Sequence, residues 1–108
     1  MSTKKIGIAE IEHEFGTLTF ASLLKAHRLG EEMTQVQMAK KLGLSKQSLN
    51  DLESGRKMPT IRRAMVLAKK MSLLPELAVQ VVLQDQVNKE KLKLSVSVKR
   101  TQDMPKAS

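Results

Sequence analysis

A cluster of polar side chains in the stretch LSKQSLNDLESGRKMP, near the middle of the chain, is the feature best suited to chemistry. The cluster consists of Lys46, Gln47, Asn50 and Asp51. On a helix these side chains lie near one another, because residues three and four apart are neighbours. An ammonium group, two amides and a carboxylate can donate and accept hydrogen bonds in several directions. The cluster is therefore either a solvated helix face or a surface that recognises hydrogen-bonding groups of a partner.

The apolar residues around the cluster predict two short helices joined by a tight turn. Ala39 is small enough to let the two helices cross closely, and Gly43 supplies the positive φ that the turn requires. Leu49 follows six residues after Gly43 and points from the later helix into the crossing. Four further apolar residues close the core: Met38, Leu42, Leu44 and Leu52.

Capping signals predict five helices. Thr34 and Gln37 form a capping box, in which each side chain satisfies a backbone donor near the other. Gly55 ends the third helix, and Pro75 suits the first turn of the fifth. In chain order, the predicted helices cover residues 20–30, 35–42, 46–54, 61–71 and 75–87.

The two ends of the chain depart from this helical pattern. Residues 1–18 fit an N-terminal arm or a short strand, and the helical domain covers residues 19–88. Residues 89–100 are predicted to hold a short C-terminal strand, because Leu92, Leu94, Val96 and Val98 alternate with polar residues, which is the period of a strand with one buried face. A strand needs a partner, either the N-terminal segment or the same strand of a second subunit. We expect residues 101–108 to be a disordered tail.

The positive charge of the chain is concentrated in its middle. The formal net charge is +8, and residues 21–73 hold eleven Lys and Arg against four Asp and Glu, a net of +7. A basic domain indicates a polyanionic partner, although charge that serves only solubility would give the same total.

Composition bounds the fold and excludes several function classes. A chain of 108 residues with two Phe as its only aromatics must build its core from aliphatic residues and Met, which favours helix packing. No apolar run is long enough to span a membrane, and the lack of cysteine suits a cytoplasmic protein. There is no glycine-rich phosphate loop, and His13 and His27 lack metal-ligand spacing. We therefore expect no enzyme activity, no cofactor and no metal.

These residues together resemble the phage repressor/Cro-type (XRE family) helix-turn-helix domain. The resemblance runs from about Ala21 to Leu73 and includes LLKAHR, TQ, QMAKKLGLS, SLNDLESG and Pro59. It implies an all-α fold, a compact five-helix repressor-like domain. From the patterns at its two ends we add a short C-terminal β-strand and an N-terminal arm.

The resemblance also implies roles for individual residues. The third helix would lie in the DNA major groove and contact base edges with its N-terminal residues. Gln35 would bond a DNA phosphate and brace this helix, and Arg28 would pair with Glu53 beneath the motif. The implied DNA-binding residues are Gln35, Ser45, Lys46, Gln47, Ser48, Asn50, Asp51, Arg56, Lys57, Arg62 and Arg63. The implied structural residues are Arg28, Ala39, Gly43, Leu49, Glu53 and Gly55.

Base chemistry agrees for most of the cluster. Lys46 can donate to guanine O6 and N7, and Gln47 can pair with the N6/N7 edge of adenine. Asp51 fits less easily, because phosphates repel a carboxylate. It must accept from cytosine N4 or lie off the interface.

The expected function is sequence-specific DNA binding by a transcriptional regulator, most simply a repressor. It would act as a homodimer on a pseudo-palindromic operator in double-stranded DNA, associated with the bacterial nucleoid when bound. The alternative is an antitoxin that represses its own operon and also binds a toxin protein. From a different class, a protein-interaction module that has lost DNA binding is opposed by Gln35, Lys46 and Gln47.

Overall fold

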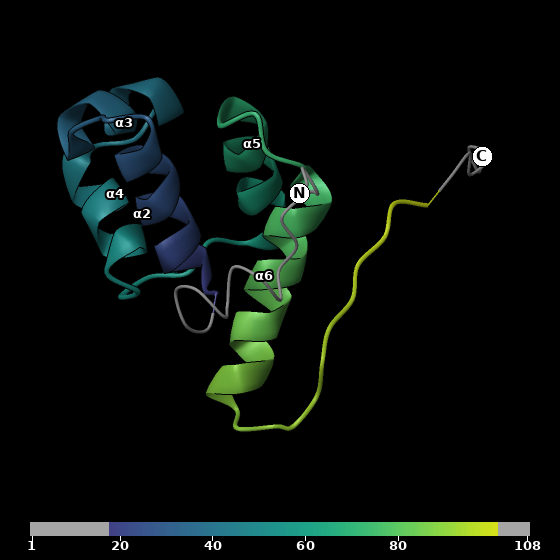
Figure 1. Ribbon diagram of the computed structural model, residues 1–108. Helices are drawn as coiled ribbons and strands as arrows, with labels where there is room; N and C mark the ends of the chain where they lie inside the picture. The colour runs from purple at the N-terminus through teal and green to yellow at the C-terminus, as the bar shows by residue number, and fades with distance from the viewer. Residues whose placement is uncertain (1–17, 102–108) are drawn as a thin grey trace, which may run out of the picture. The chain divides into compact units, whose positions relative to one another are not determined.

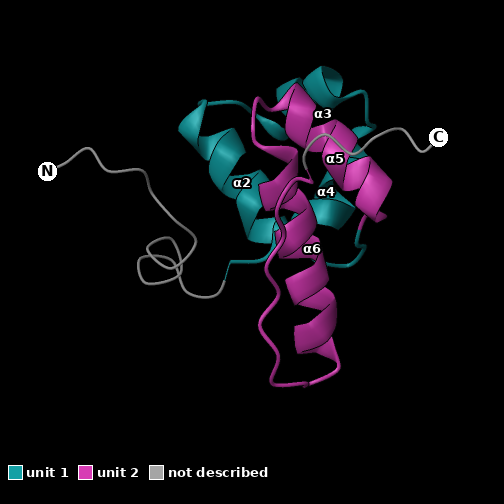
Figure 2. Ribbon diagram, turned by 90° about the vertical axis from the view of Figure 1, so that its right-hand side faces the viewer, with its two compact units in different colours: residues 1–58 teal, residues 59–108 magenta. Residues whose placement is uncertain are grey.

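The computed structural model describes residues 18–101, which form five α-helices followed by extended backbone (Figure 1). The helices are α2 (Phe20–Gly30), α3 (Gln35–Leu42), α4 (Lys46–Glu53), α5 (Ile61–Lys70) and α6 (Pro75–Lys89). The chain divides into two compact units, residues 1–58 and residues 59–108 (Figure 2). The arm predicted for residues 1–18 and the tail predicted for residues 101–108 lie outside the described residues, apart from Leu18 and Thr101.

In the first unit, α2 and α3 both pack against α4. Leu24, Met38 and Leu49, one from each helix, are fully buried, and Ala39 is almost so. Phe20 of α2 is buried as well. Burial of these side chains stabilises the core by about 25 cal/mol for each Å² of apolar surface that is removed from water. The two-helix crossing predicted from Ala39 and Leu49 is therefore part of this core.

The turn between α3 and α4 is closed by backbone geometry. Gly43 has φ 73°, in the left-handed region, and caps α3. The Gly43 N–H donates to Lys40 O at 3.2 Å and the Leu44 N–H donates to Ala39 O at 2.8 Å. This pair of bonds is the Schellman arrangement, which satisfies carbonyls left free at a helix end. Ser45 then caps α4, so the turn is short and its direction is determined.

The second unit contains α5 packed against α6. Ala64, Ala68 and Ala78 are completely buried, and such small side chains let the two helices approach closely. Larger apolar residues fill the remaining core: Leu67, Met71, Val81 and Val82.

The short C-terminal β-strand predicted within residues 89–100 was wrong. α6 continues to Lys89, and residues 92–101 form no strand. The backbone is extended, but its polar groups bond to α6 side chains instead of another strand. Gln84 Oε1 accepts from the Val96 N–H at 2.7 Å, and Gln84 Nε2 donates to Leu94 O at 2.9 Å.

A second glutamine and an ion pair continue this attachment along α6. Gln80 Oε1 accepts from the Val98 N–H at 3.0 Å, and Arg100 Nε donates to Glu76 Oε2 at 2.9 Å. The α6 residues involved are four apart, so they lie in one row on the helix. A glutamine amide can both donate and accept, as a neighbouring strand would. Side chains of α6 therefore replace the strand partner that the alternating pattern requires.

Candidate nucleic-acid interface

The start of α4 presents three exposed side chains on a helix whose opposite face is buried in the core. Ser45 caps α4 by accepting from the Ser48 N–H at 3.0 Å. Lys46, Gln47 and Ser48 are exposed, whereas Leu49 on the opposite side is fully buried. Because the buried face determines the rotation of the helix, the exposed side chains have a defined direction.

The second turn of α4 behaves differently from the first. Asn50 is half-buried, and Asp51 is buried with 9% of its surface exposed. A carboxylate with so little access to water requires polar partners. Gln47 and the loop after α4 supply them.

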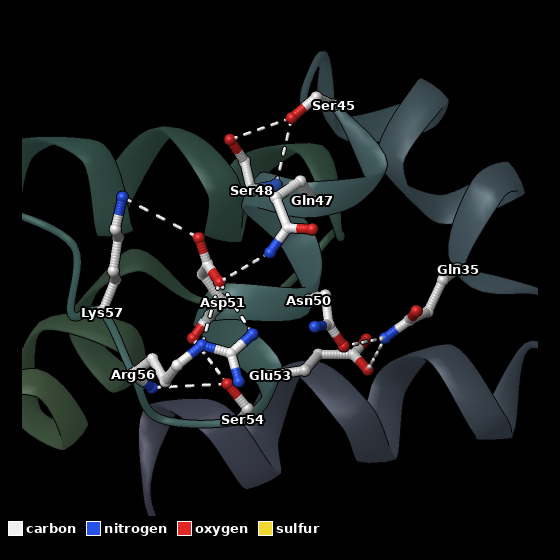
Figure 3. A network of polar contacts seen from close by, with 10 residues as sticks. All are labelled: Gln35, Ser45, Gln47, Ser48, Asn50, Asp51, Glu53, Ser54, Arg56 and Lys57. Atoms are coloured by element: carbon white, nitrogen blue, oxygen red, sulfur yellow. Dashed lines mark hydrogen bonds and ion pairs between the residues drawn. The ribbon is translucent and has the colours of Figure 1, made fainter.

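Asp51 is the centre of a polar network on this face (Figure 3). Its Oδ1 accepts from Gln47 Nε2 at 3.0 Å, and from Arg56 Nε and Nη2 at 3.1 and 2.8 Å. Its Oδ2 lies 3.8 Å from Lys57 Nζ. The hydrogen bonds from Arg56 hold the pKa of Asp51 below its ordinary value of 3.8, so the group is ionised at neutral pH.

Beneath the network, Glu53 connects α4 to both other helices of the unit. Arg28 Nε and Nη2 donate to its two carboxylate oxygens at 2.8 and 3.1 Å. Gln35 Nε2 donates to Glu53 Oε1 at 3.1 Å and lies 3.3 Å from Asn50 Oδ1 (Figure 3). The amide nitrogen of Gln35 is therefore directed at α4, which fits the bracing role implied for this residue. Its contact with a phosphate remains a prediction.

The other basic residues of the predicted interface belong to two separate units. Arg56 and Lys57 follow α4 in the first unit and are exposed. Arg62 and Arg63 lie at the start of α5 in the second unit, and both are exposed. The structure thus brings Arg56 and Lys57 to the polar cluster and presents the other two arginines to solvent.

The hydrogen bond between Gln47 and Asp51 was not predicted from the sequence. The signal was present, since a Gln and an Asp four residues apart on a helix can hydrogen-bond. Glu53 was not predicted as the acceptor for Gln35 either, because that contact joins two helices and local sequence spacing does not indicate it.

Residues 18–101 contain neither a candidate metal site nor a candidate membrane-spanning helix. No group of three His, Asp or Glu residues there is placed to hold a metal ion. None of the helices in this range has the length and apolar character needed to cross a membrane.

Part of the chain is similar to a known protein family. Residues 24–75 match a protein-family model described as Helix-turn-helix. The matched residues extend from within α2 to the first residue of α6 and include the whole polar network. No curated protein and no solved structure matches the chain.

Proposed function

We propose that this chain, whose residues 24–75 belong to the XRE/Cro-type helix-turn-helix family, is a transcriptional repressor that inserts α4 into the major groove of a pseudo-palindromic operator. Family membership makes it a DNA-binding transcription regulator in general terms. The observation that carries the finer proposal is the exposed start of α4. Lys46 and Gln47 project there from a helix that Leu49 and the Arg28–Glu53 pair hold in place.

The test begins with selection of bound sites from random DNA. Binding is then measured by fluorescence anisotropy on a selected duplex and on a scrambled one. We expect Lys46→Ala or Gln47→Ala to weaken specific binding about fivefold or more, because one good base contact gives about 1–3 kcal/mol of discrimination. Non-specific binding should change far less.

Lys25→Ala is the matched control, because it removes the same charge from an exposed residue of α2, outside the proposed interface. It should leave the preference for the selected site intact. If Lys46→Ala and Gln47→Ala combined in one variant bind the selected site as well as the wild-type protein does, α4 does not recognise bases.

Backbone contacts are tested by salt dependence. Arg63→Ala should weaken specific and non-specific binding alike and reduce the salt slope by about one, because a phosphate contact carries no sequence information. Arg63 is the better choice for this test, since Arg56 also hydrogen-bonds Asp51 and its loss would disturb α4. A salt slope that does not change would remove Arg63 from the interface.

A homodimer is part of the proposal, since one recognition helix contacts too few base pairs for useful specificity. The extended segment supports it. Residues 94, 96 and 98 direct backbone groups toward α6, so the alternate residues direct theirs to the opposite edge, as extended backbone requires. That edge can pair with the same segment of a second copy, and Leu92 and Leu94 beside it are 50% and 60% exposed. A monomeric mass in light scattering at micromolar concentration would contradict the dimer.

The second candidate is an antitoxin that represses its own operon and binds a toxin protein. The described chain continues past the matched residues through α6 and the extended segment, which offers surface for a protein contact. A toxin-like reading frame beside the gene would favour this candidate. Co-expression with the product of that frame, followed by purification of a stable complex, would support it, and separate elution would oppose it.

A further inference from the structure

The Gln47 side chain is held in one orientation by its neighbour on α4. Gln47 and Asp51 are four residues apart, and Nε2 of the amide lies 3.0 Å from Oδ1 of the carboxylate. Arg56 contacts the same Oδ1 with two guanidinium nitrogens (Figure 3). Arg56 therefore holds the carboxylate in place from the loop side, while Gln47 bonds to it from the start of the helix.

The polarity of this contact follows from chemistry. An ionised carboxylate only accepts hydrogen bonds, so it requires the NH₂ group of Gln47 and repels its carbonyl oxygen. The choice between the two amide orientations is thereby made by Asp51. The Gln47 amide keeps its Oε1 and one N–H for a partner outside the protein. Because the Gln47 side chain is exposed, this acceptor and this donor are accessible to such a partner.

We propose that Asp51 is a specificity-determining positioning residue, which orients the Gln47 amide so that it selects adenine and disfavours guanine. Adenine offers an N6 donor and an N7 acceptor in the major groove, which match an amide with one acceptor and one donor. Guanine offers two acceptors, O6 and N7, and would require both amide hydrogens of Gln47. One of those hydrogens is already bonded to Asp51. The inference rests on the proposed function, in which α4 enters the major groove.

The same arrangement explains how a carboxylate is tolerated beside DNA. Only 12% of the Asp51 side chain is exposed. Its single negative charge lies beside two positive charges, those of Arg56 and Lys57. The group of three side chains has a net positive charge, so it attracts phosphates. Asp51 acts through Gln47 and does not itself need to contact a base.

The experiment uses the full chain and duplexes derived from a selected site. The base pair recognised by Gln47 is identified as the one where Gln47→Ala loses discrimination. At that pair the wild-type protein should prefer adenine over guanine by about tenfold or more. Asp51→Ala removes the acceptor shared by Gln47 and Arg56, so Gln47 is free to take both orientations. The preference for adenine over guanine should then fall to about threefold or less.

Glu90→Gln is the control, because it removes one negative charge from an exposed position at the end of α6. It should raise affinity for all duplexes slightly and leave the adenine preference unchanged. Circular dichroism and thermal unfolding establish that each variant is folded.

A measurement without DNA makes the test independent of variant stability. In the wild-type protein, the side-chain NH₂ resonances of Gln47, assigned by comparison with Gln47→Ala, should shift as acid protonates Asp51. Resonances that do not move would overturn the proposal, as would a wild-type preference for guanine. So would an Asp51→Ala variant that keeps the full adenine preference while Gln47→Ala loses it, and this result leaves the proposed function standing. Selected-site binding unaffected by Gln47→Ala would overturn base recognition by Gln47 and this inference together.

Discussion

Arg28 and Glu53 form a two-point ion pair that joins α2 to α4. Nε and Nη2 of the guanidinium donate to the two carboxylate oxygens at 2.8 and 3.1 Å. The two side chains are 13% and 4% exposed, so both charged groups are largely desolvated. Parallel hydrogen bonds of this kind set geometry as well as energy, because the planar fork fits a carboxylate in one orientation. The pair therefore determines how α4 is presented.

Removal of one partner should be costly because the other charge would remain buried. We expect Arg28→Met to lower the free energy of unfolding by about 3 kcal/mol, the cost of breaking a buried ion pair. Urea denaturation followed by circular dichroism measures it. Lys25→Met on the same helix is the control, since Lys25 is exposed, and it should change stability by less than about 0.5 kcal/mol. Equal losses in the two variants would show that the ion pair contributes nothing.

Gly55, after the end of α4, tests backbone strain in isolation. Its φ is +82°, and a Cβ added there would meet no other atom within 4 Å. Gly55→Ala should therefore destabilise the protein by about 1–2 kcal/mol through the left-handed conformation alone. Gly55→Asn should cost less, because Asn tolerates this region better.

Gly30 provides the comparison for Gly55. It lies at the end of α2, and an added Cβ there would also meet open space, but its φ is outside the left-handed region. Gly30→Ala should be neutral or stabilise the protein by up to about 1 kcal/mol, since alanine loses less entropy on folding. Thermal unfolding of both variants gives the difference. A Gly55→Ala protein as stable as Gly30→Ala would contradict the assignment of strain.

Local sequence signals predicted the helices well because caps act within a few residues. Thr34 and Gln37 do form a capping box, and Gly43 does adopt the left-handed conformation at the end of α3. The fifth helix was predicted to residue 87 and ends at Lys89, because no capping side chain marks its end. Boundaries without a cap are decided by fraying of the last turn, which leaves little signal in sequence.

Contacts between distant residues were harder to predict. The alternation in residues 92–98 predicted a strand, which was wrong because alternation does not specify what bonds to the backbone. Gln80 and Gln84 occupy that role, and on a helix they look like ordinary polar surface residues. For the polar cluster, burial of Asp51 depends on Arg56 folding back from the loop, which helical spacing does not encode.

The imidazole of His27 should make stability depend on pH. Burial lowers the pKa of His27 below its ordinary value of 6.5, and the nearby Lys41 ammonium lowers it further, while Glu31 opposes the shift. Its Nε2 is buried with no hydrogen-bond partner among the described residues. The unfolded chain therefore takes up a proton more readily than the folded protein does. Stability should fall as pH decreases through 6.5 and level off below the folded-state pKa.

Urea denaturation between pH 8 and pH 5, about 1.5 units on either side of the His pKa, measures this dependence. His27→Gln has no titrating group at this position, so the part of the slope that begins near pH 6.5 should be reduced. The difference between the two curves isolates His27 from other groups that titrate. A variant curve parallel to that of the wild-type protein would contradict the predicted shift.

Gln84 should control how firmly the extended segment is attached to α6. It forms two hydrogen bonds to the segment, at Leu94 O and at the Val96 N–H, and both are lost in Gln84→Ala. We expect the Val96 amide to exchange with solvent at least about tenfold faster, since each hydrogen bond contributes about 1 kcal/mol. Gln86→Ala, an exposed glutamine of the same helix, is the control and should leave this exchange unchanged. Hydrogen exchange followed by NMR gives the rates residue by residue. Equal rates in Gln84→Ala and in the wild-type protein would contradict the role of Gln84 in holding the segment on α6.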